Sequence, residues 1–176
     1  MTIPELTPPP QIPSPATTAD ERAMLEGWLE QHRTVLAVKC AGLDDAQLRE
    51  ASVPPSDLTL MGLVRHMADV ERGWFRRVLA GEDAPPLHYS DDDLDGDFRV
   101  TEQDTFGTVY ATWQHEIERA REAAASRSLD DLNLGAHRSG ETFNLRWIMT
   151  HMIEEYARHN GHADLIRQSI DGATGD

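Results

Sequence analysis

Apolar residues recur at intervals of three and four positions along most of the chain, which is the spacing of amphipathic helices. No stretch alternates apolar and polar residues in the way that a half-buried strand does. The pattern therefore predicts an all-α fold. Its four helices are expected at about residues 17–42, 57–80, 102–126 and 144–170.

Capping residues mark the expected helix ends. Thr17 and Thr18 each precede an acidic residue by three positions, as in a capping box, so the first helix is expected to begin there. Gly42 should end it. Gly81 and Gly172 follow the second and fourth helices, and glycine often closes a helix because it adopts the left-handed conformation at little cost.

A long, acidic segment separates the second and third predicted helices. It is too long for a tight turn, and its polarity predicts a solvated surface crossover. The spacing of its glycine and glutamate excludes an EF-hand calcium loop. Four helices with two long connections predict a four-helix bundle in which not every sequential pair is an antiparallel hairpin. The segment contains Pro85, Pro86, Asp91, Asp92, Asp93, Asp95 and Asp97.

The N-terminus is rich in proline, with six of the ten prolines among the first eighteen residues. Proline fixes φ and removes a backbone donor, so residues 1–18 are expected to form an extended arm before a single domain over 19–176. Its apolar Ile3, Leu6 and Ile12 would lie along the domain or a partner subunit, and a mobile tail is the alternative.

Charge narrows the classes of function. The chain carries 31 acidic and 16 basic side chains, a formal charge of −15, which argues against binding to nucleic acids or anionic membranes. No apolar run approaches the roughly 20 residues that span a bilayer, and no signal-peptide pattern is found at the N-terminus. The one cysteine, Cys40, lies in an apolar context and is expected to be buried and unreactive. These features favour a cytoplasmic protein that acts on a small molecule.

Polar residues interrupt the apolar face of the last predicted helix. Ile148, Met152 and Ile166 lie within about 40° of one another on a helical wheel and define the face that meets the core. The same arc contains Glu155, His159 and His162. An unpaired buried charge is strongly unfavourable, so these groups require partners or a metal ion.

The second helix carries a matching polar residue. His66 lies three residues after Leu63 and four before Val70, on the apolar stripe. Glu155 and His159, at i and i+4, stack on one side of their helix, and a third ligand from a facing helix would complete a metal site. A buried Glu–His ion pair is the alternative.

The chemistry of these side chains restricts the metal. Three protein ligands leave a coordination position open, as in catalytic zinc sites. Two imidazoles and a carboxylate suit zinc best, while nickel, iron(II), manganese and cobalt are also compatible.

The remaining histidines and the tryptophans are expected to lie beside the site, at the surface or in the core. His151 is also four residues from Glu155 but lies near the edge of the stripe, so it is expected to flank the site. His162 is expected to be a polar pocket residue beside a ligand or substrate. Surface or boundary positions are predicted for His32, His88, His115 and His137, and core or rim packing for Trp28, Trp74, Trp113 and Trp147.

Two segments resemble a known family. Residues 60–75 (LMGLVRHMADVERGWF) and 146–167 (RWIMTHMIEEYARHNGHADLIR) are similar to the DinB superfamily, particularly its mini-circle and mycothiol-dependent maleylpyruvate isomerase-like branch. The resemblance implies a DinB/YfiT-like four-helix bundle. It also implies a divalent metal bound by His66, Glu155 and His159. Many members carry histidine at position 155, and the glutamate resembles the mycothiol-dependent branch.

The same resemblance implies an activity. Characterised relatives use the metal to activate a low-molecular-weight thiol, such as mycothiol or bacillithiol, so the chain is expected to be a detoxifying thiol S-transferase acting on small electrophiles. Homodimers are common in the superfamily. Two alternatives are a hydrolase that uses metal-bound water, with His162 or Glu154 as base, and a non-catalytic, stress-related helical module that a metal stabilises.

Overall fold

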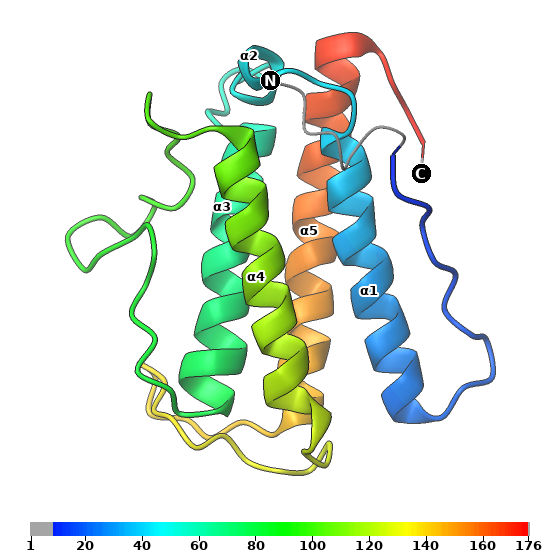
Figure 1. The fold of residues 1–176 in the computed structure, drawn as a ribbon, viewed down its shortest axis with the longest axis vertical. Helices are drawn as coiled ribbons and strands as arrows, with labels where there is room; N and C mark the ends of the chain where they lie inside the picture. Colours follow the sequence, from blue (N-terminus) through cyan, green and yellow to red (C-terminus); the bar gives the residue numbers. More distant parts are fainter. Residues whose placement is uncertain (1–8, 176) are drawn as a thin grey trace.

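The computed structural model describes residues 9–175 as long helices joined by extended loops (Figure 1). The described residues form no strand and contain two isolated β-bridges, so the predicted all-α class is confirmed. The sequence pattern did not predict two of the elements. These are a π-helical segment that continues α3 and a short helix that follows α1. The elements are α1 (Glu21–Cys40), α2 (Asp45–Leu48), α3 (Leu60–Glu71), η2 (Arg72–Leu79), α4 (Phe106–Ala125) and α5 (Leu145–Asp171).

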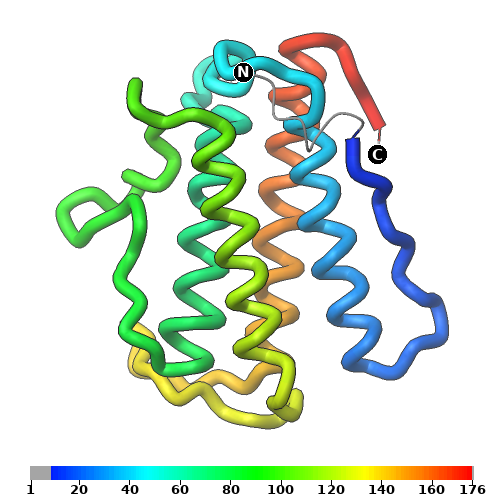
Figure 2. Tube along the Cα trace, viewed as in Figure 1, coloured from blue at the N-terminus to red at the C-terminus, as the bar shows by residue number. Residues whose placement is uncertain are grey.

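The four long helices form a bundle in which sequential neighbours are not all antiparallel. In Figure 2, α1 and α5 run upward, whereas α3 with η2 and α4 run downward. Because α3 and α4 are parallel, residues 80–105 must return the chain from the bottom of the bundle to its top. The predicted long crossover is therefore confirmed.

Three helices begin later than the sequence pattern predicted. The predicted start of α1 at Thr17 or Thr18 is wrong, because the carboxylate of Asp20 caps the helix by accepting the N–H of Ala23 at 2.9 Å. Helix α3 is capped by Thr59 rather than starting near residue 57, and α4 is capped by Thr105 rather than starting near residue 102. Each cap supplies an oxygen to a backbone N–H that lacks a helical partner.

The expected glycine ends are confirmed. Gly172 adopts φ 79° at the end of α5. Gly81, with φ 69°, lies two residues after the last residue of η2. Both values lie in the left-handed region that glycine tolerates best.

The hydrophobic core fills the space between the four long helices. Its largest fully buried side chains include Leu36, Leu63, Met67, Phe75 and Trp113. Cys40 is also buried, as predicted, at 1% exposure. None of the helices in residues 9–175 is long and apolar enough to cross a membrane.

A hydrogen-bonded network inside this core joins one residue from each long helix. Glu71 of α3 is fully buried and accepts from Arg33 of α1 at 2.8 and 2.7 Å. The Tyr156 hydroxyl of α5 donates to Glu71 at 2.7 Å and accepts from the Trp113 indole N–H of α4 at 2.9 Å. Burial alone would lower the pKa of Arg33, but the facing Glu71 carboxylate raises it above its ordinary value. The Arg33 guanidinium therefore stays charged inside the core.

The described part of the N-terminal arm runs beside α1 (Figure 1). Pro15 packs closely on this helix, since a Cβ added at Gly27 would lie 3.3 Å from the Pro15 Cβ. Ile12 belongs to this stretch, whereas Ile3 and Leu6 lie outside the described residues.

Glu71→Ala should destabilise the protein by about 3–5 kcal/mol, because it leaves the Arg33 guanidinium charged and without its carboxylate in the core. Urea denaturation at neutral pH measures this loss. The control is Glu122→Ala, which removes an exposed ion pair with Arg119 and should cost less than about 1 kcal/mol. Equal effects of the two substitutions would contradict a stabilising role for the buried network.

Candidate metal centre

The three side chains of the predicted triad meet between α3 and α5. His66, Glu155 and His159 each offer one ligand atom, and these atoms lie within 4.8 Å of one another. The imidazole centroids of His66 and His159 are 4.7 Å apart, and His159 Nε2 lies 3.5 Å from Glu155 Oε2. This geometry brings together two nitrogen donors and one oxygen donor from facing helices.

The His66 ring is fixed by the segment that connects α3 to α4. Its Nδ1 lies 2.8 Å from Asp97 Oδ2, and the Phe98 ring stacks on it at 4.1 Å. Next to a carboxylate, Nδ1 carries the proton, which leaves the lone pair of Nε2 available. His66 Nε2 is buried and has no hydrogen-bond partner among the described residues. A buried nitrogen acceptor in this position fits a metal ligand.

Glu155 presents its two oxygens to different neighbours. Oε2 faces His159, while Oε1 lies 3.6 Å from His151 Nε2 and 3.5 Å from an Arg158 nitrogen. The interaction with His159 lowers the pKa of Glu155 despite the opposing effect of burial, and the charge of Arg158 adds to the shift. The carboxylate is therefore ionised at neutral pH, as a metal ligand must be.

The two histidines predicted to flank the site lie on either side of it along α5. His162 Nδ1 is 3.4 Å from His159 Nδ1, where it faces the nitrogen that points away from Glu155. Burial lowers the pKa of His162, and the neighbouring His159 and Arg158 lower it further. His151 approaches both Glu155 and Glu154, each at 3.6 Å.

These last contacts create a second group with metal-ligand spacing, consisting of His151, Glu154 and Glu155. Glu154 is exposed and forms an ion pair with Arg158, whose positive charge compensates that of the carboxylate. His66, Glu155 and His159 are the better candidates because His159 is buried and His66 Nε2 has no partner in the part of the chain that the structure describes.

The acidic crossover does not remain solvated throughout, so that part of the prediction is wrong. Asp97 is only 4% exposed, although it belongs to the acidic run. Two charged residues of α3 provide the partners that let the crossover pack. Asp69 accepts the backbone N–H of Leu87 at 2.6 Å, and Arg65 contacts the backbone carbonyl of Asp97 at 3.3 Å.

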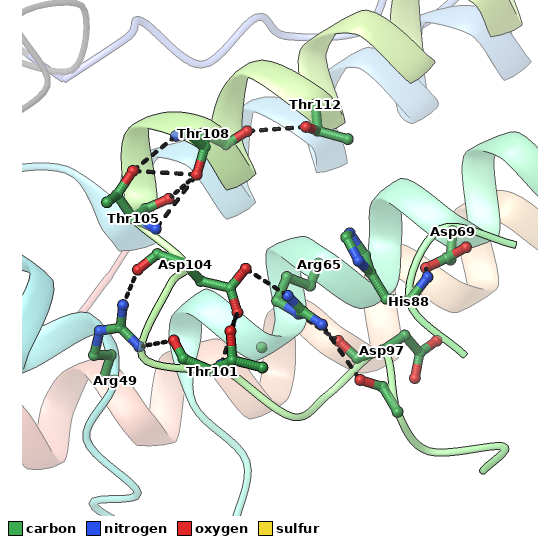
Figure 3. A network of polar contacts seen from close by, with 12 residues as sticks. Arg49, Arg65, Asp69, His88, Asp97, Thr101, Asp104, Thr105, Thr108 and Thr112 are labelled. Atoms are coloured by element: carbon green, nitrogen blue, oxygen red, sulfur yellow. Dashed lines mark hydrogen bonds and ion pairs between the residues drawn. The ribbon is translucent and has the colours of Figure 1, made fainter. Parts of the chain in front are cut away.

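Figure 3 shows how the end of the crossover is held against α3. The Arg65 guanidinium forms an ion pair with Asp104 at 2.7 Å, and Asp104 accepts the Thr101 backbone N–H at 2.7 Å. Arg49, which follows α2, donates to the Thr101 carbonyl at 2.8 Å. Asp97 and Phe98 are therefore positioned by a network that reaches well beyond the candidate centre.

Gly62 allows the crossover backbone to approach α3 closely. A Cβ at this position would lie 2.4 Å from the Phe98 carbonyl oxygen, a distance that side-chain rotation cannot relieve. Gly62 is one turn from His66, so the close approach places Phe98 against the His66 ring.

Asp97 and Phe98 were not predicted from the sequence to belong to the site. Two signals were available: Arg65 and Asp69 are charged residues close to His66 in a helix that is largely apolar. Their burial at 5% and 3% shows that this side of α3 is covered. What covers it depends on long-range packing, which helical periodicity does not encode.

The single thiol of the chain is separate from this site. Cys40 lies at the end of α1, and burial raises the pKa of its thiol to about 12. At neutral pH it is protonated and enclosed, so it does not supply a nucleophile.

A comparison with known families identifies the family of the chain. The model of the family described as Mycothiol-S-transferase matches residues 24–172. The chain belongs to the mycothiol S-transferase family, which is DinB-like. No curated protein matches the chain significantly. The matched range includes the candidate triad and the crossover but excludes the arm over residues 1–18.

Gly62→Ala should cost roughly 1–3 kcal/mol of stability, because the new methyl group displaces the Phe98 backbone. Hydrogen exchange should also accelerate at residues 96–99. The matched control is Gly161→Ala in α5, where nothing lies within 4 Å of the added Cβ, and it should gain roughly 0.5–1 kcal/mol. A neutral Gly62→Ala with unchanged exchange would show that the close approach does not hold the crossover.

Proposed function

We propose that this protein is a metal-dependent S-transferase that joins a mycothiol-type thiol to small electrophiles. Membership of the mycothiol S-transferase family supports the reaction class. The observation that carries the metal centre is His66 Nε2, a buried acceptor that has no hydrogen-bond partner within residues 9–175 and converges with Glu155 and His159.

His66 Nε2, His159 Nε2 and Glu155 Oε2 would hold a divalent ion. The donor set of two imidazoles and a carboxylate suits zinc, and it is also compatible with nickel, iron(II), manganese or cobalt. When bound, such an ion lowers the pKa of a coordinating thiol, so that the thiolate is present at neutral pH. Three protein ligands leave room for that thiol.

The surrounding residues orient this donor set. Asp97 accepts from His66 Nδ1 and keeps Nε2 directed at the site. Phe98 stacks on one face of His66 and excludes water from that side. His162 contacts His159 Nδ1, on the ring edge away from Glu155. The nucleophile must come from a bound thiol, because the Cys40 thiol is buried and protonated.

Hydrolysis by metal-bound water is an alternative for which His162 is the better placed of the two candidate bases. That reaction needs a general base, and Glu154, one of the two candidates, is half exposed and paired with Arg158. A non-catalytic role for the metal is the remaining alternative. The homodimer and the cytoplasmic location stay predictions.

The activity test uses zinc-loaded full-length protein, mycothiol and monochlorobimane, and follows conjugate fluorescence. Wild-type protein should accelerate conjugation, and a chelator should abolish the acceleration. Glu155→Gln should lower the rate at least about a hundred-fold, because an uncharged amide replaces a ligand. The adjacent Glu154→Gln is the matched control and should stay within about three-fold of wild type, since Glu154 is exposed.

Three results would contradict the proposal. These are no acceleration with mycothiol or bacillithiol, equal rates for the two glutamate variants, and turnover of an ester or amide without any thiol. The last result would favour the hydrolase instead.

A further inference from the structure

An aromatic cluster extends the candidate centre toward the bottom of the bundle. It consists of Trp74 in η2, His137 and Phe143 in the loop before α5, and Trp147 and His151 in α5. Trp74 stacks on His137 at 5.0 Å and 16°, and Trp147 stacks on His151 at 5.0 Å and 17°. Phe143 lies 4.4 Å from Trp147, and Trp74 lies 4.7 Å from His151. Three separate parts of the chain therefore contribute rings to one cluster.

The cluster is continuous with the candidate centre. His159, Glu155, His151 and Trp147 follow one another at four-residue intervals, so they lie on one side of α5 about 6 Å apart along its axis. His151 Nε2 lies 3.6 Å from Glu155 Oε1 and its ring contacts both Trp147 and Trp74. Trp147 and Glu155 are therefore about 12 Å apart along the axis, and the ring of His151 lies between them.

The backbone holds the cluster in place. Trp74 lies within the π-helical segment, and such segments are frequent at functional sites. The loop before α5 is anchored to η2 by the N–H groups of Leu134 and Gly135, which donate to the carbonyls of Leu79 at 3.1 Å and Val78 at 2.9 Å. A Cβ at Gly135 would lie 1.9 Å from the Arg77 carbonyl oxygen, so only glycine permits this approach. A ring platform held in this way is preorganised for a ligand.

Part of the cluster faces solvent. Trp147 is 43% exposed, although its indole is among the largest apolar groups in the chain. Core packing therefore does not account for it, and an exposed aromatic group beside a polar centre is typical of a binding site.

We propose that the aromatic cluster binds the planar, electron-poor ring of an aromatic electrophile. The proposal rests on the S-transferase function and specifies its substrate class. The electron-rich indole face attracts an electron-deficient ring in an offset stack. In transfer to a chloroarene, the thiolate sulfur bonds to the ring carbon, chloride leaves with the bonding electron pair, and the thiol proton passes to solvent.

A binding measurement tests the cluster without requiring catalysis. The probe is 1,3-dinitrobenzene, which is planar and electron-poor and has no leaving group, measured by equilibrium dialysis against zinc-loaded full-length protein. Wild type should bind it saturably, and Trp147→Leu should weaken binding roughly five- to ten-fold. Trp28→Leu is the matched control, because Trp28 is 44% exposed on α1 and should change binding less than two-fold.

A kinetic comparison connects the cluster to the reaction. For mycothiol transfer, Trp147→Leu should lower the ratio of kcat/KM for 1-chloro-2,4-dinitrobenzene to that for iodoacetamide by about five-fold, whereas Trp28→Leu should leave the ratio unchanged. Iodoacetamide has no ring, so the ratio cancels a general loss of activity.

The two experiments separate the possible failures. Saturable arene binding that depends on Trp147, without transfer to any electrophile, would support the cluster and overturn the S-transferase function. Arene binding that is absent, or equal in both tryptophan variants, would overturn the aromatic site. Loss of a dimer in Trp147→Leu, again without arene binding, would instead make the cluster a contact between two copies of the chain.

Discussion

The buried carboxylate of Glu71 is the constraint on which the arrangement of the bundle depends. A charge inside the core is tolerated only with close partners, and Glu71 takes them from α1 and α5 through Arg33 and Tyr156. Tyr156 immediately follows Glu155, and Glu71 lies five residues after His66. The 2.7 Å bond between Tyr156 and Glu71 therefore fixes the register of α5 against α3 next to the candidate centre.

The crossover supplies a second constraint on the other side of α3. Arg65 and Asp69 hold its backbone, Gly62 permits its close approach, and Asp97 then reaches His66 Nδ1. His66 is thus located by core packing and oriented by a loop. A metal-ligating imidazole needs both a fixed position and a fixed tautomer, and here the core supplies the first and the loop the second. The aromatic cluster follows the same principle, with a loop anchored on η2 completing a surface that the helices begin.

Local periodicity accounts for what the sequence could predict. Intervals of three and four residues identified the helices, and the positions of His66, Glu155 and His159 on apolar stripes predicted that they converge. Family membership then agreed with the resemblance that these helices showed. The role of these residues as metal ligands remains a proposal.

Features that depend on contacts between distant segments were missed. Nothing in the local pattern around Asp97 distinguishes it from the exposed aspartates nearby, and its burial comes from the way the crossover packs on α3. Trp147 was predicted to pack in the core or at its rim, but its ring contacts with Trp74 and Phe143, which are distant in the sequence, were not predicted. The start of α1 was also predicted too early, because Asp20 caps the helix instead of either of the two threonines.

Metal affinity, measured by chelator competition on protein purified without added metal, shows directly whether His66, Glu155 and His159 hold an ion. Wild-type protein should bind one zinc or similar ion per chain. Binding should be lost in a folded His66→Ala variant and weakened roughly ten- to hundred-fold in Asp97→Asn, which removes the charge that orients His66. Absence of binding after reconstitution with divalent ions, or equal affinity in all three proteins, would contradict these predictions. Glu155, His66 and His159 would then form a buried polar network without a metal.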